Sequence, residues 1–320
     1  MKNLLFRVIL CQLLFCVIAN SGFIVDVWAH KNEEVRLQDN LGNHTYPIST
    51  SVPLAQQYFD QGLIWAYGFN HAEAAQSFLE AARLDPGCAM CFWGQALVVG
   101  PNINAPMDPF AVPTAYTAAQ KALDLSETAT EKEQALIHAV AARYSKDVVE
   151  DRSFLDQAYA DAMRTVYKQF PDDAVIASLL AESLMDLHPW DFWTKQGKAQ
   201  AWTAEILNIL ERTLQHTPNN PLANHLYIHA IEASPHPEKA LPSAKRLATL
   251  VPGSGHLVHM PAHIYIRIGH YQDAALANQQ AVKSDQHYLN HSHAESLYTA
   301  AYVPHNFHFL WAAATKTGQR

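Results

Sequence analysis

Charged residues are scarce in this sequence of 320 residues, and runs of basic residues are absent. Lys and Arg number 22 against 30 Asp and Glu, which gives a net charge of −8 with histidine neutral. Nucleic-acid-binding proteins need clustered Lys and Arg to replace phosphate counterions, so the composition excludes general nucleic-acid binding. Apolar residues make up 49% of the chain, which excludes an intrinsically disordered protein.

The apolar run near the N-terminus is too short for a comfortable transmembrane span. Lys2 and Arg7 are followed by apolar residues over 8–19, which is the arrangement of an export signal. We expect residues 1–29 to be a signal peptide or, alternatively, an uncleaved N-terminal anchor. The protein is therefore expected to be exported, to the periplasm or as a secreted protein, and to meet a membrane only through an uncleaved segment.

Cysteine is also rare, and two of the four cysteines lie within the expected signal peptide. Cys88 and Cys91 remain, and in an oxidising compartment such a pair is expected to form a disulfide. A thioredoxin-like redox role lacks the βαβ context that it requires. Covalent haem attachment is excluded because Phe92 stands where that motif has histidine.

Alternating apolar and polar residues, the pattern typical of β-strands, do not occur, and helical patterns separated by Pro or Gly turns cover nearly the whole chain. We expect helices over residues 112–123, 130–144, 172–187 and 197–216, among others. The second of these begins with the sequence TEKE, which resembles a capping box. The predicted fold class is all-α.

Histidine is the residue that this sequence has in excess, with 18 in total and 13 of them in the last third. His225, His229 and Glu232 are spaced i, i+4 and i+7, so they share one face of a helix. The histidine pair recurs 34 residues later as His259 and His263. Thirty-four residues is the length of a tetratricopeptide repeat.

The repeat predicts a tetratricopeptide-like α-solenoid of antiparallel helix pairs. We expect residues 30–50 to be a flexible lead-in and residues 51–320 to form the repeat domain. In such a solenoid the first helix of each pair lines the concave surface, and equivalent residues of successive repeats lie side by side. The histidines are therefore expected to converge in one groove.

Turn prolines place the repeats in register, and the residues that lie seven and eleven positions after each proline form two rows. His225 and His259 share one row, and Glu182, His229 and His263 share the other. A glycine that closes the final helix extends the first row to His308. The candidate metal ligands are His225, His229, Glu232, His259, His263, His308 and Glu182. Asn102 and Asn104, in a proline-rich break, and His305 are candidate residues of the ligand groove.

Imidazole and carboxylate groups on neighbouring helices suit a divalent transition metal such as Zn, Cu, Ni or Fe. One hypothesis is thus a metal-binding scaffold, and a second is a metal-dependent enzyme, a hydrolase or oxidoreductase, with Glu232 or Glu182 as general base. A third is a protein-interaction module whose groove takes a peptide or protein partner. Histidines that are simply hydrogen-bonded within a packed wall remain the structural alternative.

Two longer segments resemble a family of exported bacterial tetratricopeptide-repeat proteins of unassigned function. They run from Cys88 to Met107 (CAMCFWG to GPNINAPM) and from Val251 to Tyr265 (VPGSGHLVHMPAHIY). The resemblance implies the repeat fold and export, and it assigns no catalytic residues. Because members of that family continue further, we expect the repeat domain to be truncated at its C-terminal end, where a helix over 306–317 would lack its partner.

Overall fold

A computed structural model describes residues 35–290 and 296–318. The signal peptide expected over residues 1–29 therefore lies outside the described residues. Within them the chain is helical, and its β-type pairing is limited to two isolated bridges, Asn102 with Ala105 and Trp193 with Ala199. The all-α prediction is confirmed. None of the described helices combines the length and the apolar character that a membrane crossing requires.

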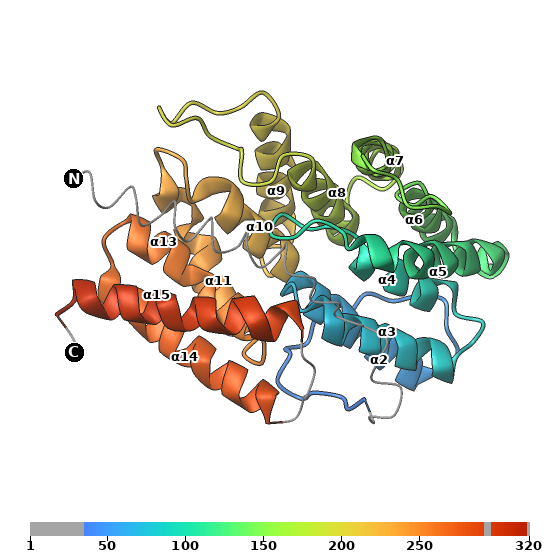
Figure 1. The fold of residues 1–320 in the computed structure, drawn as a ribbon, viewed down its shortest axis with the longest axis horizontal. Coiled ribbons are helices and arrows are strands. Elements are labelled where there is room, and N and C mark those ends of the chain that lie inside the picture. Colours follow the sequence, from blue (N-terminus) through green and yellow to red (C-terminus); the bar gives the residue numbers. More distant parts are fainter. Residues whose placement is uncertain (1–34, 291–295, 319–320) are drawn as a thin grey trace.

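Consecutive helices along the chain pack against one another as neighbours. They are α2 (Pro53–Tyr67), α3 (His71–Leu84), α4 (Ala89–Val99), α5 (Val112–Asp124), α6 (Glu131–Ala141), α7 (Ser153–Gln169), α8 (Ala174–Asp186), α9 (Thr203–His216), α10 (Pro221–Ile231), α11 (Leu241–Leu250), α12 (Gly255–His259), α13 (Pro261–Arg267), α14 (Tyr271–Leu289) and α15 (Val303–Lys316). A π-helical turn over Tyr298–Tyr302 leads into α15. Figure 1 shows α14 and α15 side by side and antiparallel.

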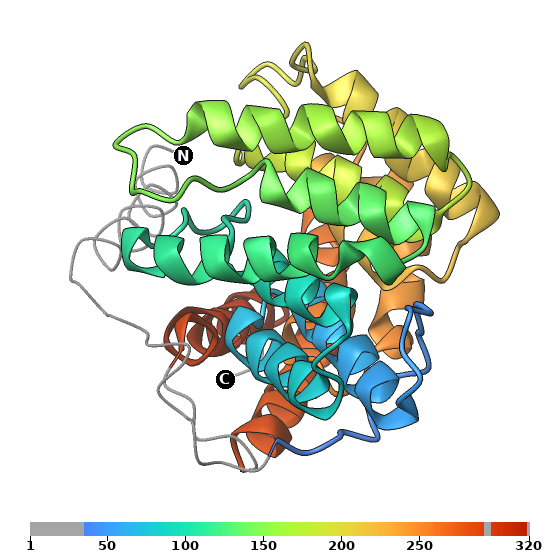
Figure 2. The ribbon, with the colours of Figure 1, turned by 90° about the vertical axis from the view of Figure 1, so that its right-hand side faces the viewer.

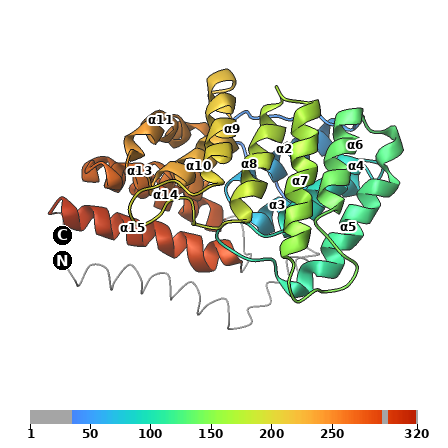
Figure 3. The ribbon, with the colours of Figure 1, turned by 90° about the horizontal axis from the view of Figure 1, so that it is seen from above.

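Alternate helices form an inner row, which includes α2, α4, α6, α8, α10, α12, α13 and α15. Within this row α2 packs on α4, α4 on α6, α8 on α10, α10 on α13, and α12 on α15. The views in Figures 2 and 3 show the remaining helices, such as α5, α7 and α9, on the outside. An additional contact joins α2 to α10, so the start of the row meets its later part. This contact encloses the inner faces that were expected to line an open groove.

Capping residues explain where several of the helices begin. Thr130 and Glu133 form the capping box that the sequence predicted for α6, because each side chain bonds the backbone N–H of the other. Asn220 accepts a hydrogen bond from the Ala223 N–H, and Pro221 takes the first position of α10, where its missing N–H costs nothing.

The helix expected over 197–216 begins later, at Thr203. Gly197 adopts a φ of 78°, in the left-handed region that favours glycine, and its turn pairs Trp193 with Ala199. The Thr203 hydroxyl donates a hydrogen bond of 2.6 Å to the Phe192 carbonyl and fixes the chain where α9 starts. A glycine-centred turn therefore replaces the first part of the expected helix.

A disulfide joins Cys88 to Cys91 at the start of α4, as the sequence predicted. Both residues are fully buried. Trp93, one turn further along, donates a hydrogen bond of 3.1 Å from its indole nitrogen to the Leu136 carbonyl of α6. The disulfide therefore links the first turn of α4, a helix that is packed within the core.

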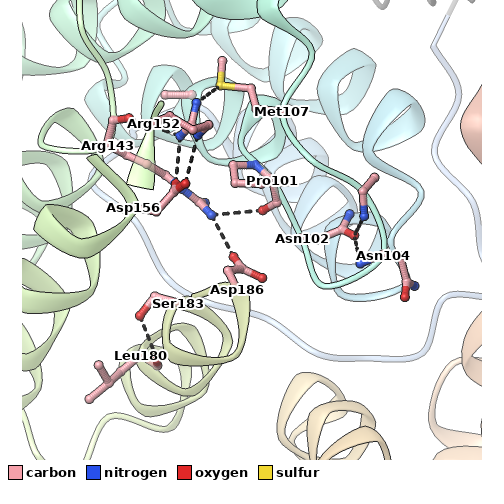
Figure 4. A network of polar contacts seen from close by, with 12 residues as sticks. Pro101, Asn102, Asn104, Met107, Arg143, Arg152, Asp156, Leu180, Ser183 and Asp186 are labelled. Carbon is pink, nitrogen blue, oxygen red and sulfur yellow. Dashed lines mark hydrogen bonds and ion pairs between the residues drawn. The ribbon is translucent and has the colours of Figure 1, made fainter. Parts of the chain in front are cut away.

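A buried ion-pair network holds the proline-rich break between α4 and α5 (Figure 4). The Arg143 guanidinium donates 2.7 Å to an Asp186 carboxylate oxygen and 3.0 Å to the Pro101 carbonyl, and it lies 3.5 Å from Asp156. Burial by itself would lower the pKa of Arg143, but the neighbouring carboxylates outweigh it and raise the pKa above its usual range. Every charge in this network thus has a partner of opposite sign close to it.

Candidate metal centre

Six histidines form two clusters of three in the inner row. His225, His229 and His256 make the first cluster, which we call triad A. His259, His263 and His305 make the second, triad B. Within each triad one ring nitrogen from every histidine lies within 4.8 Å of the others, so each triad could hold a metal ion.

Helix spacing explains how triad A and triad B acquire their histidines. In α10, His225 and His229 stand one turn apart. His256, His259 and His263 are spaced i, i+3 and i+7 across α12 and α13. Pro261 begins α13, and the bend at this point leaves the three rings on one side, divided between the triads.

In both triads, contacts between Nε2 atoms are close. In triad A the Nε2 atoms of His225 and His229 are 3.0 Å apart, and that of His256 is 3.1 Å from His225. In triad B the Nε2 atoms of His259 and His263 are 2.9 Å apart. Five of the six rings therefore point Nε2 toward the centre of their triad.

The other ring nitrogen of four histidines faces an oxygen that can only accept a hydrogen bond. His225 Nδ1 lies 2.7 Å from the Tyr67 carbonyl oxygen. His259 Nδ1 lies 2.7 Å from Asn278 Oδ1, whose identity is fixed because the Asn278 amide nitrogen donates to the Ala274 carbonyl. Both imidazoles must therefore carry their proton on Nδ1.

Glu232 accepts a hydrogen bond of the same kind from one histidine of each triad. One carboxylate oxygen lies 3.2 Å from His229 Nδ1 in triad A, and the other lies 2.9 Å from His263 Nδ1 in triad B. Burial alone would raise the pKa of Glu232, but the two imidazoles outweigh it and hold the pKa well below its usual range. A single ionised carboxylate thus orients one ring of each triad.

These hydrogen bonds leave the Nε2 atoms with their lone pairs. His225 and His229 point two lone pairs at each other across 3.0 Å, and His259 and His263 do the same across 2.9 Å. Two facing lone pairs repel unless a positive centre lies between them. A proton can bridge two nitrogens, whereas a metal ion satisfies all three nitrogens of a triad.

Burial disfavours the protonated alternative for most of these rings. It lowers the pKa of His225, His256 and His259 well below the usual value, and the neighbouring imidazoles lower them further. Burial also lowers the pKa of His229, and that of His305 falls to about 3. Neutral imidazole is the form that binds a metal ion, so each triad could hold one.

Aromatic rings enclose the two triads. The Phe69 ring lies 4.6 Å from the His225 ring, and the Phe309 ring lies 4.7 Å from His259 and 4.6 Å from His263, between ring centroids. The residue before Phe69 is Gly68, and the chain packs tightly at this point. A Cβ at Gly68 would lie only 2.5 Å from the Ser254 hydroxyl oxygen, so a larger residue would not fit there.

Backbone strain also gathers at triad A. Among the described residues, Phe69 (φ 57°) and Trp190 (φ 62°) are the non-glycine residues with positive φ. Both pack on His229, with centroid distances of 6.3 Å for Phe69 and 5.1 Å for Trp190. Trp190 is 47% exposed, so it lies between triad A and solvent. Strained backbone of this kind concentrates at functional sites.

The structure brings together four of the seven predicted ligands: His225, His229, His259 and His263. Glu232 contacts the ring nitrogens that face away from the triads, so it orients ligands instead of serving as one. His305, expected in the ligand groove, belongs to triad B. The sequence analysis missed His256, although its i, i+3, i+7 spacing with His259 and His263 indicated a shared face.

His308 lies outside both triads and is exposed, with its ring stacked on Trp311 at 5.9 Å. His308 was predicted as a ligand in place of His305 because the last helix was expected to begin at residue 306. It begins earlier, at Val303. The earlier start puts His305 in the first turn, where its ring lies 4.9 Å from that of His259.

Glu182 also lies outside both triads, although it occupies the predicted position on α8. It lines a separate small cavity with Tyr67, His71 and Arg143. The Tyr67 backbone intervenes, because its carbonyl contacts His225 while its side chain lines the cavity. Burial, followed by the charge of Asp186, raises the pKa of the Glu182 carboxyl.

The two asparagines predicted for the ligand groove stabilise the proline-rich break. The Asn102 side-chain oxygen accepts hydrogen bonds from the backbone N–H groups of Asn104 and Ala105. The Asn104 amide donates 2.9 Å to the hydroxyl of Tyr302, whose ring lies 4.8 Å from that of His256. Asn104 therefore supports a wall of the metal centre through Tyr302.

Comparison with known proteins adds no assignment to this geometry. No protein-family model matches the sequence, and no curated protein matches it either. The function must therefore be inferred from the triads themselves.

Proposed function

We propose that this protein binds two transition-metal ions, one in each triad, and acts as a metal-dependent enzyme. The observation that carries the proposal is the pair of lone-pair contacts, His225 with His229 and His259 with His263. Each contact joins rings whose Nδ1 atoms already face an acceptor oxygen. A metal ion at each centre would turn these repulsive contacts into ligand bonds.

The number of ligands favours catalysis over a structural role. Structural zinc sites are closed by four protein ligands, whereas catalytic sites use three and keep a position open. Each triad offers three nitrogens. Inter-triad ring centroids are 5.5 Å apart for His229 and His263 and 5.9 Å apart for His256 and His259, so the two open positions are close neighbours.

Burial argues against a peptide-binding groove that displays these histidines. The side chains of His225, His229, His256 and His259 are at most 2% exposed. A peptide partner would have to open the contact between α2 and α10 to reach them. We therefore base the proposed function on metal ions.

Metal analysis of the purified protein tests the proposal. We expect two equivalents of metal per chain in the wild type after loading and desalting. The double variant H225Q/H229Q should retain only the metal of triad B, and H259Q/H263Q only that of triad A. The matched control is H308A, which removes an exposed imidazole one turn from His305 and should keep both ions.

Wild-type protein that takes up no metal would refute the proposal. Equal metal content in the wild type and both double variants would place the ions elsewhere. Glutamine keeps a polar side chain at each position, and circular dichroism of each variant establishes that it is folded before its metal content is compared.

We further propose that the helices form a tetratricopeptide-like solenoid and that the protein is exported. The packing of successive helices, with alternate helices in an inner row, supports the solenoid. The Cys88–Cys91 disulfide supports an oxidising compartment. Mass determination of the mature N-terminus would test export, since cleavage is expected near residue 29.

A further inference from the structure

The charge around the two triads limits which ions they can hold together. In the described part of the chain, Glu232 is the carboxylate that contacts the ligand histidines, and it is shared between the triads. The six ligands are neutral imidazoles. Two divalent ions would leave three positive charges uncompensated in a buried site, whereas two monovalent ions would leave one. Uncompensated buried charge is costly, so the site favours monovalent ions.

Ligand chemistry identifies the monovalent ion. Alkali cations prefer oxygen ligands, which the triads do not supply. Copper binds imidazole most strongly among the divalent first-row metals and also has a stable monovalent state. Zinc would complete its tetrahedron with a water molecule at the open position and would keep its full double charge. A cuprous ion is satisfied by the three convergent nitrogens alone and brings one charge fewer.

The surroundings of the open positions match a small apolar reactant. Phe69 covers triad A and Phe309 covers triad B, with ring centroids 4.6 to 4.7 Å from the nearest ligand rings. Glu232 is poorly placed to act as general base for a hydrolytic water, because its oxygens face the Nδ1 atoms of ligand histidines, on the side of each ring opposite to Nε2. The walls therefore favour dioxygen over a polar substrate that must be oriented and hydrolysed.

We propose that triads A and B hold a pair of cuprous ions that together reduce dioxygen by two electrons. This inference rests on the proposed metal-binding function. Each cuprous ion loses one electron and becomes cupric. Dioxygen takes both electrons, and its double bond becomes a single bond. Two water molecules each give one proton to complete hydrogen peroxide, and the two hydroxide ions that remain stay with the cupric ions and offset the added charge. One chain thus supplies both electrons for one molecule of dioxygen.

The two triads lie close enough to act on one molecule. Ring centroids of different triads are 5.5 and 5.9 Å apart, and those of the same triad, such as His229 and His256, are up to 6.3 Å apart. The closest rings of the two triads are therefore about as far apart as the most distant rings within triad A. A reactant at one open position is within reach of the other.

The first experiment titrates metal-free protein with cuprous ions under anaerobic conditions, against a coloured cuprous chelator, and in parallel with Zn²⁺. We expect two tightly held cuprous ions per chain and weaker binding of the second Zn²⁺. Two equivalents of Zn²⁺ held as tightly as copper would overturn the copper assignment and leave the proposed function intact. No binding of either metal would overturn both.

The second experiment admits dioxygen to the copper-loaded protein and follows hydrogen peroxide and the cupric electron-spin resonance signal. We expect one peroxide per chain at a rate that does not depend on protein concentration. H259Q/H263Q, loaded with one copper, must meet a second molecule, so at micromolar protein its rate should fall about a hundredfold and rise with concentration. H308A should match the wild type.

A wild-type rate that rises with protein concentration would show that the triads act separately and would overturn the inference. So would copper that stays cuprous in air, or equal rates per copper in the wild type and the one-site variant. A second variant, H225Q/H229Q, empties the other triad and must give the same loss. This requirement separates loss of the copper pair from damage to one helix.

Discussion

The Arg143 network and the histidine triads both bury polar side chains among helices, but only the first pairs groups of opposite charge. Arg143 has Asp186 at 2.7 Å and Asp156 at 3.5 Å, so positive and negative groups alternate. In the triads, four Nε2 atoms face one another in pairs at 3.0 and 2.9 Å. Groups of opposite charge stabilise one another directly, whereas converging lone pairs repel and could be stabilised by a bound cation.

Metal removal should therefore have the largest effect on stability. A ligand present at a hundred times its dissociation constant stabilises the folded state by about 2.7 kcal/mol, so two sites should contribute about 5 kcal/mol. We expect a chelator to lower the free energy of unfolding of the wild type by about this amount, measured by urea denaturation. In H225Q/H229Q/H259Q/H263Q the chelator should leave the free energy of unfolding unchanged. A decrease equal to that of the wild type would show that the chelator does not act through the triads.

Arg143→Met should destabilise the protein by about 3 to 5 kcal/mol, because it leaves Asp186 buried without its partner, whereas Asp156 keeps its ion pair with Arg152. Its metal content should stay at the wild-type value. Arg164→Met is the control, since its ion pair with Glu205 is partly exposed and should cost at most about 1 kcal/mol. Loss of metal from folded Arg143→Met protein would show that the two regions are not independent.

Asp285 combines features of the Arg143 network and of the triads. It is a buried carboxyl group that has hydrogen-bond donors beside it but no cation among the described residues. Tyr298 and Asn306 donate to it at 2.8 and 2.7 Å. Burial raises the pKa of Asp285 from 3.8 to about 6, although both hydrogen bonds lower it. The folded protein thus keeps a proton that the unfolded chain releases. The resulting stabilisation is present below pH 3.8 and is lost as the pH rises to about 6.

We therefore expect the stability of the wild type, relative to Asp285→Asn, to fall by about 3 kcal/mol between pH 3.5 and pH 7. Chemical denaturation of both proteins across this range measures the difference. Asp273→Asn removes an exposed carboxylate and serves as the control. A constant difference between wild type and Asp285→Asn at all pH values would contradict the prediction.

Glu232→Gln should have a smaller effect, confined to the triads. An amide can accept a hydrogen bond at its oxygen but presents N–H groups at its nitrogen. Either His229 or His263 would then face a donor, move its own proton to Nε2 and stop serving as a ligand. We expect metal affinity to fall about 10- to 100-fold, mainly at one triad.

Competition titration of Glu232→Gln measures this loss. Glu238→Gln is a matched control, because Glu238 faces the ring of the exposed His236 at 3.2 Å. An equal loss at both triads would indicate that the charge of Glu232, and not its orientation of one ring, controls affinity.

Local sequence patterns predicted much of this arrangement. The spacing of His225 and His229, and of His259 and His263, identified the four residues that make the closest contacts. The TEKE motif predicted the capping box of α6. These features depend on residues within a few positions of one another, which is the range that helix periodicity controls.

The remaining features depend on contacts between distant segments. Glu182 occupies its predicted position, but Tyr67 of α2 separates it from the triads. His305 replaces His308 because α15 begins after a π-helical turn that no periodic pattern announced. The place of Trp190 beside His229 follows from a left-handed backbone conformation, which no local pattern in the sequence indicated. Sequence spacing specifies a helix face, and packing decides what that face meets.

The hydrogen bond between His225 and the Tyr67 carbonyl spans 158 residues of sequence. Its formation requires α2 and α10 to meet, and the helices between them must first be folded and packed. Long-range contacts of this kind tend to form late. The chain must first lose the conformational entropy of closing the intervening segment, and only then does the contact stabilise the fold. We therefore expect the contact that keeps the proton of His225 on Nδ1 to form late in folding, so metal uptake by triad A would report that α2 and α10 have met.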